Sequence, residues 1–595
     1  MLTKDQFAIL YELFKSGDKK LSQRDLSRLL RVSLGKINSN AAELKAAGLI
    51  DGECRLSGSG LLALEPYKVK NAVIMAAGMS TRFAPLSYEK PKALLKVKGE
   101  ILIEREIRQL QEAGIGDITV VVGYMKEKLF YLADKFNVKI AVNEDYYRYN
   151  NTSSLILFSD RADNSYVCSS DDYFVENVFE PYVYHSYYSA VYTPDQTDEY
   201  CLTEDRNGRI TKVTIGGCAS WYMLGHVYFS RDFSRKFFRI LKDEYNSPET
   251  KSELWENLYM RHTDELDLYI RKYDSGKIRE FDSLDELRDF DKDYIINADS
   301  SIFRNINRTL HISDSDIVDI HPIKTGLTNT SFRFRAGNQQ YIYRHPGIGT
   351  ELYINRKSEA ASMQIAKELG LDETFIYINP EEGWKLSYFV DQARTLDYHN
   401  QKDVRSALSM VRKLHGSGKT TEYFFDIWKE LGKFEKLIAE RGRDAFDDFA
   451  DMHLGITKLH DFVEADGVPK CLCHCDCYDP NFLIDPEGKM YLIDWEYSGM
   501  SDPAGDLGTF LACSDYTMDE ADEIIREYLQ HKPSAGELRH FIAYAAVLSY
   551  YWFLWAIYQD SVGKPVGEYL YIWYRYTKSY GRRALGLYEE EKERV

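Results

Sequence analysis

Small residues and two cations that could hold a triphosphate follow a short apolar run near the start of the chain. Residues 72–75 (Ala-Val-Ile-Met) are predicted to form a buried strand. The residues that follow it are Ala76, Ala77 and Gly78. A loop of this kind lets backbone N–H groups approach an anion, because no bulky side chain blocks them. Arg82 and Lys92 then supply positive charge. We expect this stretch to hold nucleotide phosphates while one phosphorus is attacked.

Two acids end the next informative strand. The run from Asn164 to Ser170 is mostly apolar or small and leads directly into Asp171 and Asp172. Carboxylates at such a strand end suit a Mg²⁺ ion that bridges phosphates. Asp171 is the preferred ligand, and the choice between it and Asp172 stays open.

A second catalytic pattern lies far downstream. Residues His474 to Asn481 read His-x-Asp-x-x-x-x-Asn, with Asp476 in the third position, and Asp494 follows. Asp476 can take a proton from a substrate hydroxyl, while Asn481 and Asp494 can hold a metal ion. Strand-like runs flank all three residues. The spacing therefore predicts a kinase-like fold.

The segment before this motif adds residues that could hold ATP. A polar turn between two expected strands contains Gly326, Asn329 and Ser331. A turn of this type can cover phosphates. Arg344 lies on the next expected strand, and Glu359 on the helix after it could orient the guanidinium by an ion pair.

Alternating strands and helices must position the first site. Residues 118–125 predict a second buried strand, and a helix over Glu104–Ala113 separates it from the first. This order predicts a doubly wound parallel sheet over residues 69–295, with its ligand at the carboxyl ends of the strands. A capped helix starting near Phe281 should close the domain, and residues 295–304 should be a linker. The kinase-like domain, which we expect to be bilobal, occupies residues 301–595.

Residues 1–68 predict a small unit of helices and a two-stranded wing. One helix begins near Ser22, and Ser33–Ala47 predicts another that would be the recognition helix. The pattern resembles a winged helix-turn-helix module. Ten Lys and Arg against eight Asp and Glu in residues 1–66 leave a net charge of only +2. DNA contact and a docking or dimerisation role both stay open.

Composition limits the remaining classes. A chain of 595 residues predicts three or four domains, and a net charge of −18 argues against a protein that mainly coats nucleic acid. Nine cysteines do not make a disulfide framework in so long a chain. Residues 541–558 carry no charge, but their four tyrosines and one serine favour a buried helix over a membrane span. We expect a soluble cytoplasmic protein of undetermined oligomeric state.

Four cysteines alternate with the downstream motif, at Cys471, Cys473, Cys475 and Cys477. Thiols beside a histidine invite a zinc interpretation. However, alternate residues of an extended strand lie in a row and do not surround one ion. Packing beside the catalytic loop is therefore the preferred interpretation.

The upstream motif resembles the signature of nucleotidyltransferases that join an NTP to a phosphorylated metabolite and release pyrophosphate. That family usually has Gly-x-Gly-x-Arg, and Ser80 replaces the second glycine here. The resemblance to cytidylyltransferases implies that Asn151 and Ser153 lie near the base, although a capped helix start would explain them equally. It also implies that Glu256 supplies a second carboxylate to the metal, where a surface acid is the alternative.

The downstream half resembles the choline and aminoglycoside kinases, which have arginine at the position of Arg344. Trp552 and Trp555 lie three apart on one expected helix face, where aromatic faces could attract a quaternary ammonium. From the residues alone, core packing is the alternative. The resemblance to choline kinases implies that these tryptophans bind choline together with Glu496, Tyr497 and Tyr569.

Together the two resemblances imply a bifunctional enzyme with Mg²⁺ in both sites. It would phosphorylate choline with ATP, then transfer CMP from CTP to phosphocholine, giving CDP-choline and pyrophosphate for the decoration of surface glycans. Ethanolamine or 2-aminoethylphosphonate is an alternative amine substrate. A choline-responsive transcription regulator that uses the winged helix is an alternative of another class.

Overall fold

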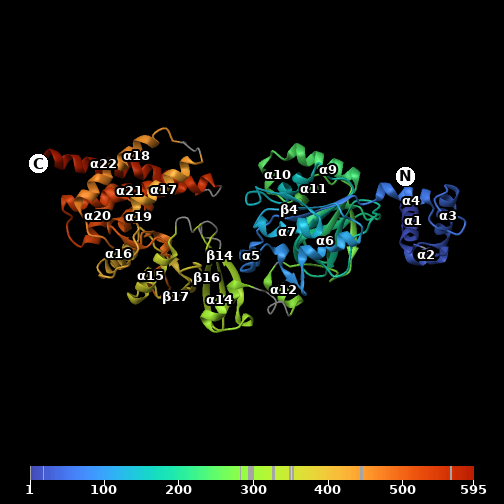
Figure 1. Cartoon of the computed structure of the whole chain (residues 1–595), viewed down its shortest axis with the longest axis horizontal. Coiled ribbons are helices and arrows are strands. Elements are labelled where there is room, and N and C mark those ends of the chain that lie inside the picture. Colours follow the sequence, from blue (N-terminus) through green and yellow to red (C-terminus); the bar gives the residue numbers. More distant parts are fainter. Residues whose placement is uncertain are drawn as a thin grey trace. The chain divides into compact units, whose positions relative to one another are not determined.

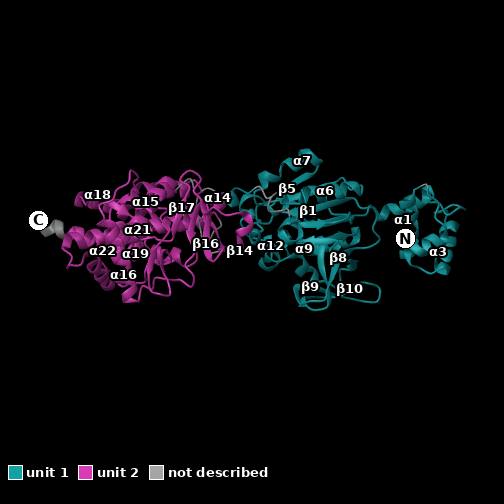
Figure 2. Ribbon diagram, turned by 90° about the horizontal axis from the view of Figure 1, so that it is seen from below, with its two compact units in different colours: residues 1–304 teal, residues 305–595 magenta. Residues whose placement is uncertain are grey.

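The computed structural model describes residues 2–594 except 18, 282, 293–299, 324–328, 348–349, 351–353, 442–445 and 563–565, and the side chains of 591–594 are likewise outside the description. Two compact units make up the chain, residues 1–304 and 305–595 (Figure 2). Each unit has its own hydrophobic core and is described by itself.

The first unit begins with a small helical module. Its helices are α1 (Lys4–Ser16), α2 (Gln23–Leu30), α3 (Leu34–Ala46) and α4 (Gly58–Leu64). Thr3, Ser22 and Ser33 cap the first three helices with their side-chain oxygens, which satisfies backbone N–H groups at each start. In place of two wing strands, a single antiparallel bridge joins Ile50 to Leu56. The winged-helix interpretation stays a prediction.

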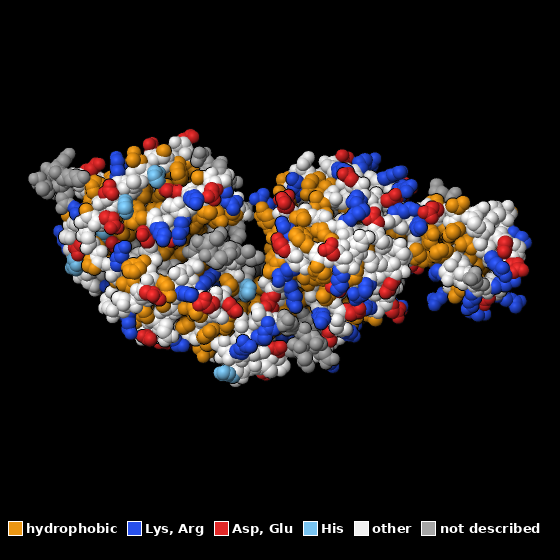
Figure 3. Space-filling model, in the orientation of Figure 1, with side chains coloured by type: hydrophobic (Ala, Val, Ile, Leu, Met, Phe, Trp, Pro, Cys, Tyr) orange, Lys and Arg blue, Asp and Glu red, His pale blue; other side chains and the backbone are white. Residues whose placement is uncertain are grey.

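The module shares its core with the sheet domain that follows. Tyr182 packs into the same apolar cluster as Leu10, Leu26 and Leu44, and its ring lies 4.9 Å from that of Phe14. Exposed basic residues gather near α2, as the blue edge of this module in Figure 3 shows. They are Lys19, Lys20, Arg24, Arg28 and Arg31. DNA contact by residues 1–68 stays a prediction.

A nine-stranded sheet forms the centre of the first unit. Its main order is β10-β9-β11-β6-β1-β4-β5, with β8 paired to β11 and β12. The strands are β1 (Asn71–Ala76), β4 (Ile118–Val122), β5 (Lys139–Val142), β6 (Ser165–Ser169), β8 (Tyr187–Thr193), β9 (Thr197–Glu204), β10 (Ile210–Gly217), β11 (Ser220–Phe229) and β12 (Tyr269–Tyr273). β6, β1, β4 and β5 are parallel, which confirms the predicted parallel sheet, whereas β9, β10 and β11 extend it antiparallel.

Helices cover both faces of this sheet (Figure 1). Ile74 points into one core with α6 (Leu102–Glu112) and α7 (Tyr131–Phe136), while Val73 points into the other with α9 (Arg231–Glu244) and α11 (Trp255–Arg261). Both sides of β1 are buried, so the strand is continuously apolar rather than alternating. Its carboxyl end therefore opens between two packed layers.

Short elements complete the first unit. They are α5 (Leu86–Glu89), α8 (Thr152–Leu155), α10 (Pro248–Ser252), α12 (Leu284–Phe290), β2 (Lys96–Val97), β3 (Glu100–Ile101), β7 (Asp172–Phe174) and β13 (Ile278–Glu280). The expected linker is partly wrong. Residues 301–304 begin a helix, α14 (Ser301–Leu310), because Glu89 accepts hydrogen bonds from the backbone N–H groups of Ser301 and Ile302.

The second unit starts with a five-stranded antiparallel sheet in the order β14-β15-β16-β18-β17. The strands are β14 (Val318–Ile323), β15 (Thr330–Ala336), β16 (Gln339–His345), β17 (Phe375–Ile378) and β18 (Lys385–Tyr388). One helix, α15 (Arg356–Glu368), follows β16. This layer carries the expected phosphate-side residues.

Helices form most of the remaining unit. They are α16 (Gln401–His415), α17 (Ile427–Ala439), α18 (Phe449–Asp466), α19 (Ala504–Cys513), α20 (Met518–Leu529), α21 (Ala535–Ser561) and α22 (Tyr569–Arg594). Short strands lie beside the downstream motif: β19 (Arg394–Thr395), β20 (Cys471–Cys473), β21 (Phe482–Ile484), β22 (Met490–Leu492) and β23 (Gly499–Ser501). A sheet followed by helices matches the predicted kinase-like fold.

α21 is the central helix of the second unit. Among the described helices it alone is long and apolar enough to cross a membrane, yet 94% of its most apolar window is buried inside the protein. It packs against α19, where a Cβ atom on Gly508 would lie 2.7 Å from the carbonyl oxygen of Tyr544. The two helix backbones approach closely only because residue 508 has no side chain.

Gly508→Ala should therefore destabilise the second unit. Overpacking a fixed backbone contact costs about 1–3 kcal/mol, and the melting temperature of the kinase half should fall by several degrees. Gly505→Ala on the same helix is the matched control, since no atom lies within 4 Å of its added Cβ. Thermal inactivation of each variant measures the difference. Equal melting temperatures would show that α19 shifts freely against α21.

Candidate functional sites

A cavity of about 440 Å³ lies at the carboxyl end of β1. Its lining comes from the loop after β1, the Pro91–Ala93 turn, residues 143–151 and the end of β6. The predicted residues Ala76, Ala77, Gly78, Lys92, Asn151 and Asp171 are all in it. Ala76 and Ala77 are buried and Gly78 is exposed, so the loop presents backbone rather than bulk to the cavity.

A cation and a carboxylate face each other in this cavity. Lys92 Nζ lies 2.8 Å from Asp171 Oδ2, and the lysine is 7% exposed. The same ammonium lies 4.8 Å from the ring centroid of Phe83. A carboxylate and an aromatic face thus fix the ammonium of Lys92 at the cavity.

The substituted glycine position and Arg82 behave differently. Ser80 has φ of +48°, in the left-handed region, where glycine is favoured over other residues. Arg82 lies on the short helical turn Thr81–Phe83, is exposed and does not line the cavity. Of the two predicted cations, the fold brings Lys92 into the cavity.

The side-chain amide of Asn143 holds one side of the cavity in place. Asn143 Nδ2 donates to Ser153 Oγ at 2.9 Å and to Ser154 Oγ at 3.1 Å. Ser153 also donates to the Asn150 carbonyl at 2.6 Å. Ser153 therefore holds the loop in place, and it is Ser154 that lines the cavity.

Glu256 does not line the cavity, but it contacts Asn151, which does. Its carboxylate accepts hydrogen bonds from Tyr188 Oη at 3.0 Å and Asn151 Nδ2 at 3.4 Å. Burial raises the pKa of Glu256 to about 7. Glu256 does not line the cavity, so its metal-ligand role stays a prediction that needs a shared cation with Asp171.

A carboxylate that the sequence analysis missed faces Asp172. Glu280 on β13 is paired in register with Asp172 on β7. Both carboxylate oxygens of Asp172 are buried without a hydrogen-bond partner in the described part of the chain. Burial raises the pKa of Asp172, and the nearby Glu280 and Asp171 add to that rise. Only the pairing of two strands a hundred residues apart reveals this acidic pair.

The kinase-like unit has a buried ion pair at its centre. Arg344 on β16 contacts Glu359 on α15 through two nitrogen–oxygen pairs, at 2.5 and 2.8 Å. Arg344 Nη1 also lies 3.4 Å from Asp494 Oδ1. Burial alone would raise the pKa of Glu359, but the charges of Arg344 and Lys385 lower it to about 2. The expected orienting pair of Arg344 and Glu359 is present.

Asp476 is held in place by a residue of its own loop. Asn481 Nδ2 donates to Asp476 Oδ2 at 2.8 Å, and Asp476 Oδ1 is buried with no described hydrogen-bond partner. Burial raises the pKa of Asp476, and the charge of Asp494 adds to that rise. One oxygen is thus fixed by a hydrogen bond, whereas the other has no described hydrogen-bond partner.

Asp506 holds this loop by accepting hydrogen bonds from its backbone. Its carboxylate accepts hydrogen bonds from the backbone N–H groups of His474 at 2.9 Å and Cys475 at 2.5 Å. His415 Nε2 lies 2.8 Å from the same carboxylate. Asp506 is fully buried, so its three contacts fix where Asp476 can lie.

The predicted phosphate turn joins the same charge cluster. Asn329 Nδ2 donates to Glu496 Oε2 at 2.8 Å, and Asn329 Oδ1 accepts from Arg356 Nη2 at 3.0 Å. Burial raises the pKa of Glu496 to about 7. Ser331 pairs in register with Arg344, whereas Gly326 lies outside the described residues. Glu496, expected at the choline site, thus contacts the ATP-side residues.

Aromatic rings gather between α21 and α22. Trp552 and Trp555 lie 5.9 Å apart, and Tyr497 lies 6.0 Å from Trp552. Trp573, which the sequence analysis missed, lies 6.0 Å from Trp552 and stacks on Tyr569 at 5.2 Å. The indole N–H groups of Trp552 and Trp555 are buried without a described hydrogen-bond partner. Together these five residues, Tyr497, Trp552, Trp555, Tyr569 and Trp573, form what we call the aromatic cluster.

Lys385 is a cation that the sequence analysis missed. It pairs in register with Arg344 on the neighbouring strand, and its ammonium lies 3.8 Å from Glu359 and 3.9 Å from Asp494.

Of the missed residues, Trp573 could have been found from the sequence, because its spacing from Tyr569 places both on one helix face. No local motif marks Lys385, because its position depends on the register of β16 and β18.

Two family descriptions match the chain. Residues 72–199 match the MobA-like NTP transferase domain, and residues 319–540 match the phosphotransferase enzyme family. These ranges contain Lys92 and Asp171 in the first case, and Arg344, Asp476 and Asp494 in the second.

Each half of the chain is similar to known proteins. A choline-phosphate cytidylyltransferase of Streptococcus pneumoniae is 34% identical over 217 residues, which are 36% of this chain and 95% of that enzyme. A 2-aminoethylphosphonate cytidylyltransferase of Lancefieldella rimae is 34% identical over 229 residues, 38% of this chain and 93% of that enzyme. The crystal structure of choline kinase LicA from Streptococcus pneumoniae is 28% identical, covers 48% of this chain and all of that one, and has a TM-score of 0.42.

The cytidylyltransferase match carries the assignment, because it spans nearly the whole of a relative at more than 30% identity. All the residues that line the cavity except Ser252 lie within residues 72–199. The chain therefore belongs to the cytidylyltransferases of the MobA-like NTP transferase family, and it carries a domain of the phosphotransferase enzyme family in the same polypeptide.

Proposed function

We propose that the chain phosphorylates choline with ATP and then transfers CMP from CTP to phosphocholine, giving CDP-choline and pyrophosphate. One observation carries the proposal: each unit holds its own set of paired cations and carboxylates. Lys92 and Asp171 form one set, and Arg344, Glu359 and Asp494 form the other. Two separate phosphate-handling sites in one chain fit two successive reactions.

The choice of choline rests on observations from both halves of the chain. One relative acts on choline-phosphate and another on 2-aminoethylphosphonate. A phosphonate has no alcohol precursor for a kinase to phosphorylate, so the attached kinase-like unit favours a phosphate ester. The aromatic cluster then favours a quaternary ammonium over ethanolamine, since a primary ammonium would need hydrogen-bond acceptors. The proposed product would serve the decoration of surface glycans.

In the cytidylyl transfer, this chain's residues bind and orient. A phosphate oxygen of phosphocholine attacks the α-phosphorus of CTP, and the bond to the β-phosphate breaks. The loop at residues 76–78 holds phosphate through its backbone N–H groups. The ammonium of Lys92 offsets the charge that develops on the attacked phosphate, and it would exchange its contact with Asp171 for that phosphate.

In the kinase reaction, the choline hydroxyl oxygen attacks the γ-phosphorus of ATP and gives its proton to Asp476. The bond from that phosphorus to the β-phosphate oxygen breaks, and ADP leaves. The hydrogen bond from Asn481 holds the carboxylate in place. Arg344, held by Glu359, is positioned to bind phosphate oxygens of ATP. The aromatic cluster would hold the trimethylammonium group.

Both sites have a donor set that fits Mg²⁺. Oxygen ligands are what this ion prefers, and carboxylate oxygens of Asp172 and Asp476 are buried without a described hydrogen-bond partner, so a bound cation would supply the missing contact. Asp171, with Glu256 or Asp172, would hold it in the first site, and Asn481 with Asp494 in the second. When bound, Mg²⁺ neutralises phosphate charge.

The proposed location is the cytoplasm, because the nine cysteines are free and the proposed substrates are intracellular.

Product analysis tests the proposal. The purified chain is incubated with ATP, CTP, Mg²⁺ and choline, ethanolamine or 2-aminoethylphosphonate in separate reactions. We expect CDP-choline and pyrophosphate from the choline reaction, at a rate well above the others. CDP-ethanolamine as the main product, or CMP transfer to 2-aminoethylphosphonate, would replace the choline assignment. A chain that binds these ligands without turnover would favour the regulator alternative.

Lys92→Ala should abolish CDP-choline formation and leave choline phosphorylation intact. Loss of one contact that stabilises the transition state costs about 3–4 kcal/mol, a rate loss of roughly two to three orders of magnitude. Lys90→Ala, two residues away, is the matched control and should keep both activities. Coupled assays for pyrophosphate and ADP measure them. Kinase activity lost together with transferase activity would contradict two independent sites.

Asp476→Asn should have the opposite effect. An amide cannot accept the hydroxyl proton, so choline phosphorylation should fall by roughly 10²–10⁴-fold. Supplied phosphocholine should still be converted to CDP-choline. Asp485→Asn, in the exposed turn before β22, is the control. Phosphorylation of choline at the parent rate would remove Asp476 from its role as base.

Trp555→Ala should raise the KM for choline far more than the KM for ATP. A desolvated cation–π contact is worth about 2 kcal/mol, which corresponds to roughly thirtyfold in affinity. Trp555→Phe should lose less because an aromatic face remains. Trp428→Ala, on α17 outside the aromatic cluster, is the control. Parallel rises in both KM values with a lower melting temperature would indicate a core role for Trp555 instead.

A further inference from the structure

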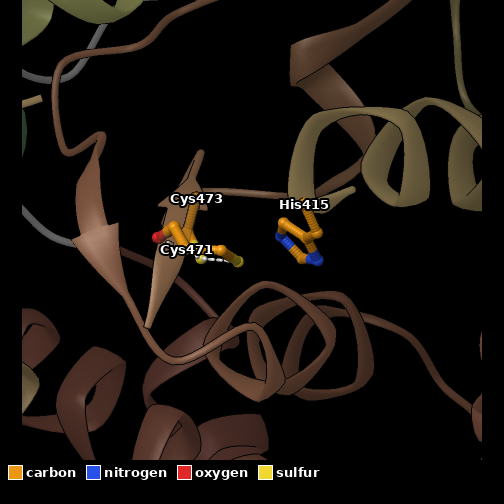
Figure 4. Close-up of side chains that lie close together, drawn as sticks. All are labelled: His415, Cys471 and Cys473. Atoms are coloured by element: carbon orange, nitrogen blue, oxygen red, sulfur yellow. Dashed lines mark hydrogen bonds between the residues drawn. The ribbon is translucent and has the colours of Figure 1, made fainter. Parts of the chain in front are cut away.

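Three potential metal ligands converge behind the catalytic loop of the kinase-like unit. They are His415 at the end of α16 and the two thiols of β20, Cys471 and Cys473 (Figure 4). Their donor atoms all lie within 4.8 Å of one another, and none of the three residues is exposed. We propose that these residues bind a thiophilic divalent ion such as Zn²⁺, at a site separate from both phosphate sites.

The spacing of the thiols fits such an ion. Cys471 Sγ and Cys473 Sγ lie 3.7 Å apart. Two thiolates bound tetrahedrally at about 2.3 Å from one zinc ion would lie roughly 3.8 Å apart. Four alternate thiols of one strand lie in a row and cannot surround a single ion. Here only Cys471 and Cys473 are needed for two positions of the tetrahedron, and His415 from a distant helix supplies the third.

The surroundings of His415 match those of a metal-bound imidazole. Its Nε2 is hydrogen-bonded to the carboxylate of Asp506 at 2.8 Å, and metal-binding histidines commonly give their second nitrogen to a carboxylate. We therefore assign Nδ1 as the ligand. Nδ1 now lies 2.7 Å from Tyr528 Oη, so the tyrosine must release this hydrogen bond. Its hydroxyl, or a water, then stands beside the fourth position.

Binding has a defined proton balance. The two thiols each lose a proton and become thiolates, and His415 binds as the neutral imidazole with its proton on Nε2. As one Zn²⁺ enters, two protons leave from the thiols, and a third leaves from Nδ1 of each imidazole that is protonated beforehand. The two thiolate charges neutralise the ion. No oxidant or reductant is needed, and Asp506 keeps its contacts with the backbone of His474 and Cys475.

The position gives the ion a structural role. β20 runs into the loop that carries Asp476, and Asp506 links that loop to His415. An ion held by His415 and β20 would tie the end of α16 to the start of the catalytic loop. It would stabilise the loop without contacting choline or ATP.

Cobalt binding by the full-length, metal-stripped protein tests the site. Co²⁺ bound tetrahedrally by two thiolates gives sulfur-to-metal charge-transfer bands and intense visible bands. We expect about one such ion per chain, loss of the bands in Cys471→Ser and in Cys473→Ser, and their retention in Cys218→Ser. Cys218 is an exposed cysteine of the other unit and reports adventitious thiol binding. Absence of the bands in the parent protein, or their survival in the Cys471/Cys473 double variant, would overturn the proposal.

A second measurement needs no variant. Cys471 is half-buried and should react slowly with iodoacetamide, and its alkylation is followed by mass spectrometry. Zinc at 100 times its Kd should slow this reaction about a hundredfold, since only the free fraction reacts. The exposed thiol of Cys218 should react at an unchanged rate. An alkylation rate at Cys471 that zinc leaves unchanged would equally overturn the site.

Discussion

Charge buried with its counter-charge is the constraint on which both halves of this chain depend. Phosphate chemistry needs ammonium, guanidinium and carboxylate groups in a dry place, and each of these is costly to bury alone. Lys92 is buried against Asp171, and Arg344 against Glu359. In each pair, the cation and the carboxylate compensate one another's charge and fix where the two side chains lie.

The second site adds a further level of support. Asp476 is fixed by Asn481, the loop around it by Asp506, and Asp506 in turn by His415. Each step passes from one element to another: loop, α19, then α16. This chain of contacts explains why so many polar side chains lie in the core of the unit, and why the thiols of β20 meet a histidine there.

Separate cores allow two reactions in one polypeptide. Residues of β1 and its neighbours pack into two clusters on either side of their sheet, and the second unit packs around α21. A fusion of this kind adds proximity between a kinase and the enzyme that would use its product, while each site retains its own chemistry.

Some features of this protein follow from short stretches of sequence. The loop at residues 76–78, the parallel strands, the motif around Asp476 and the kinase-like fold are all set by near neighbours in the chain, so composition and spacing were enough. Glu280, Lys385, Trp573 and His415 were missed because register or helix packing brings them to their partners. Glu280 meets Asp172 only through the pairing of β13 with β7, and His415 meets Cys471 only where α16 ends beside β20. Sequence determined which local chemistry was available. Tertiary structure decided which distant charges and thiols share a site, because strand register and helix packing are set by the burial of whole faces rather than by any one residue.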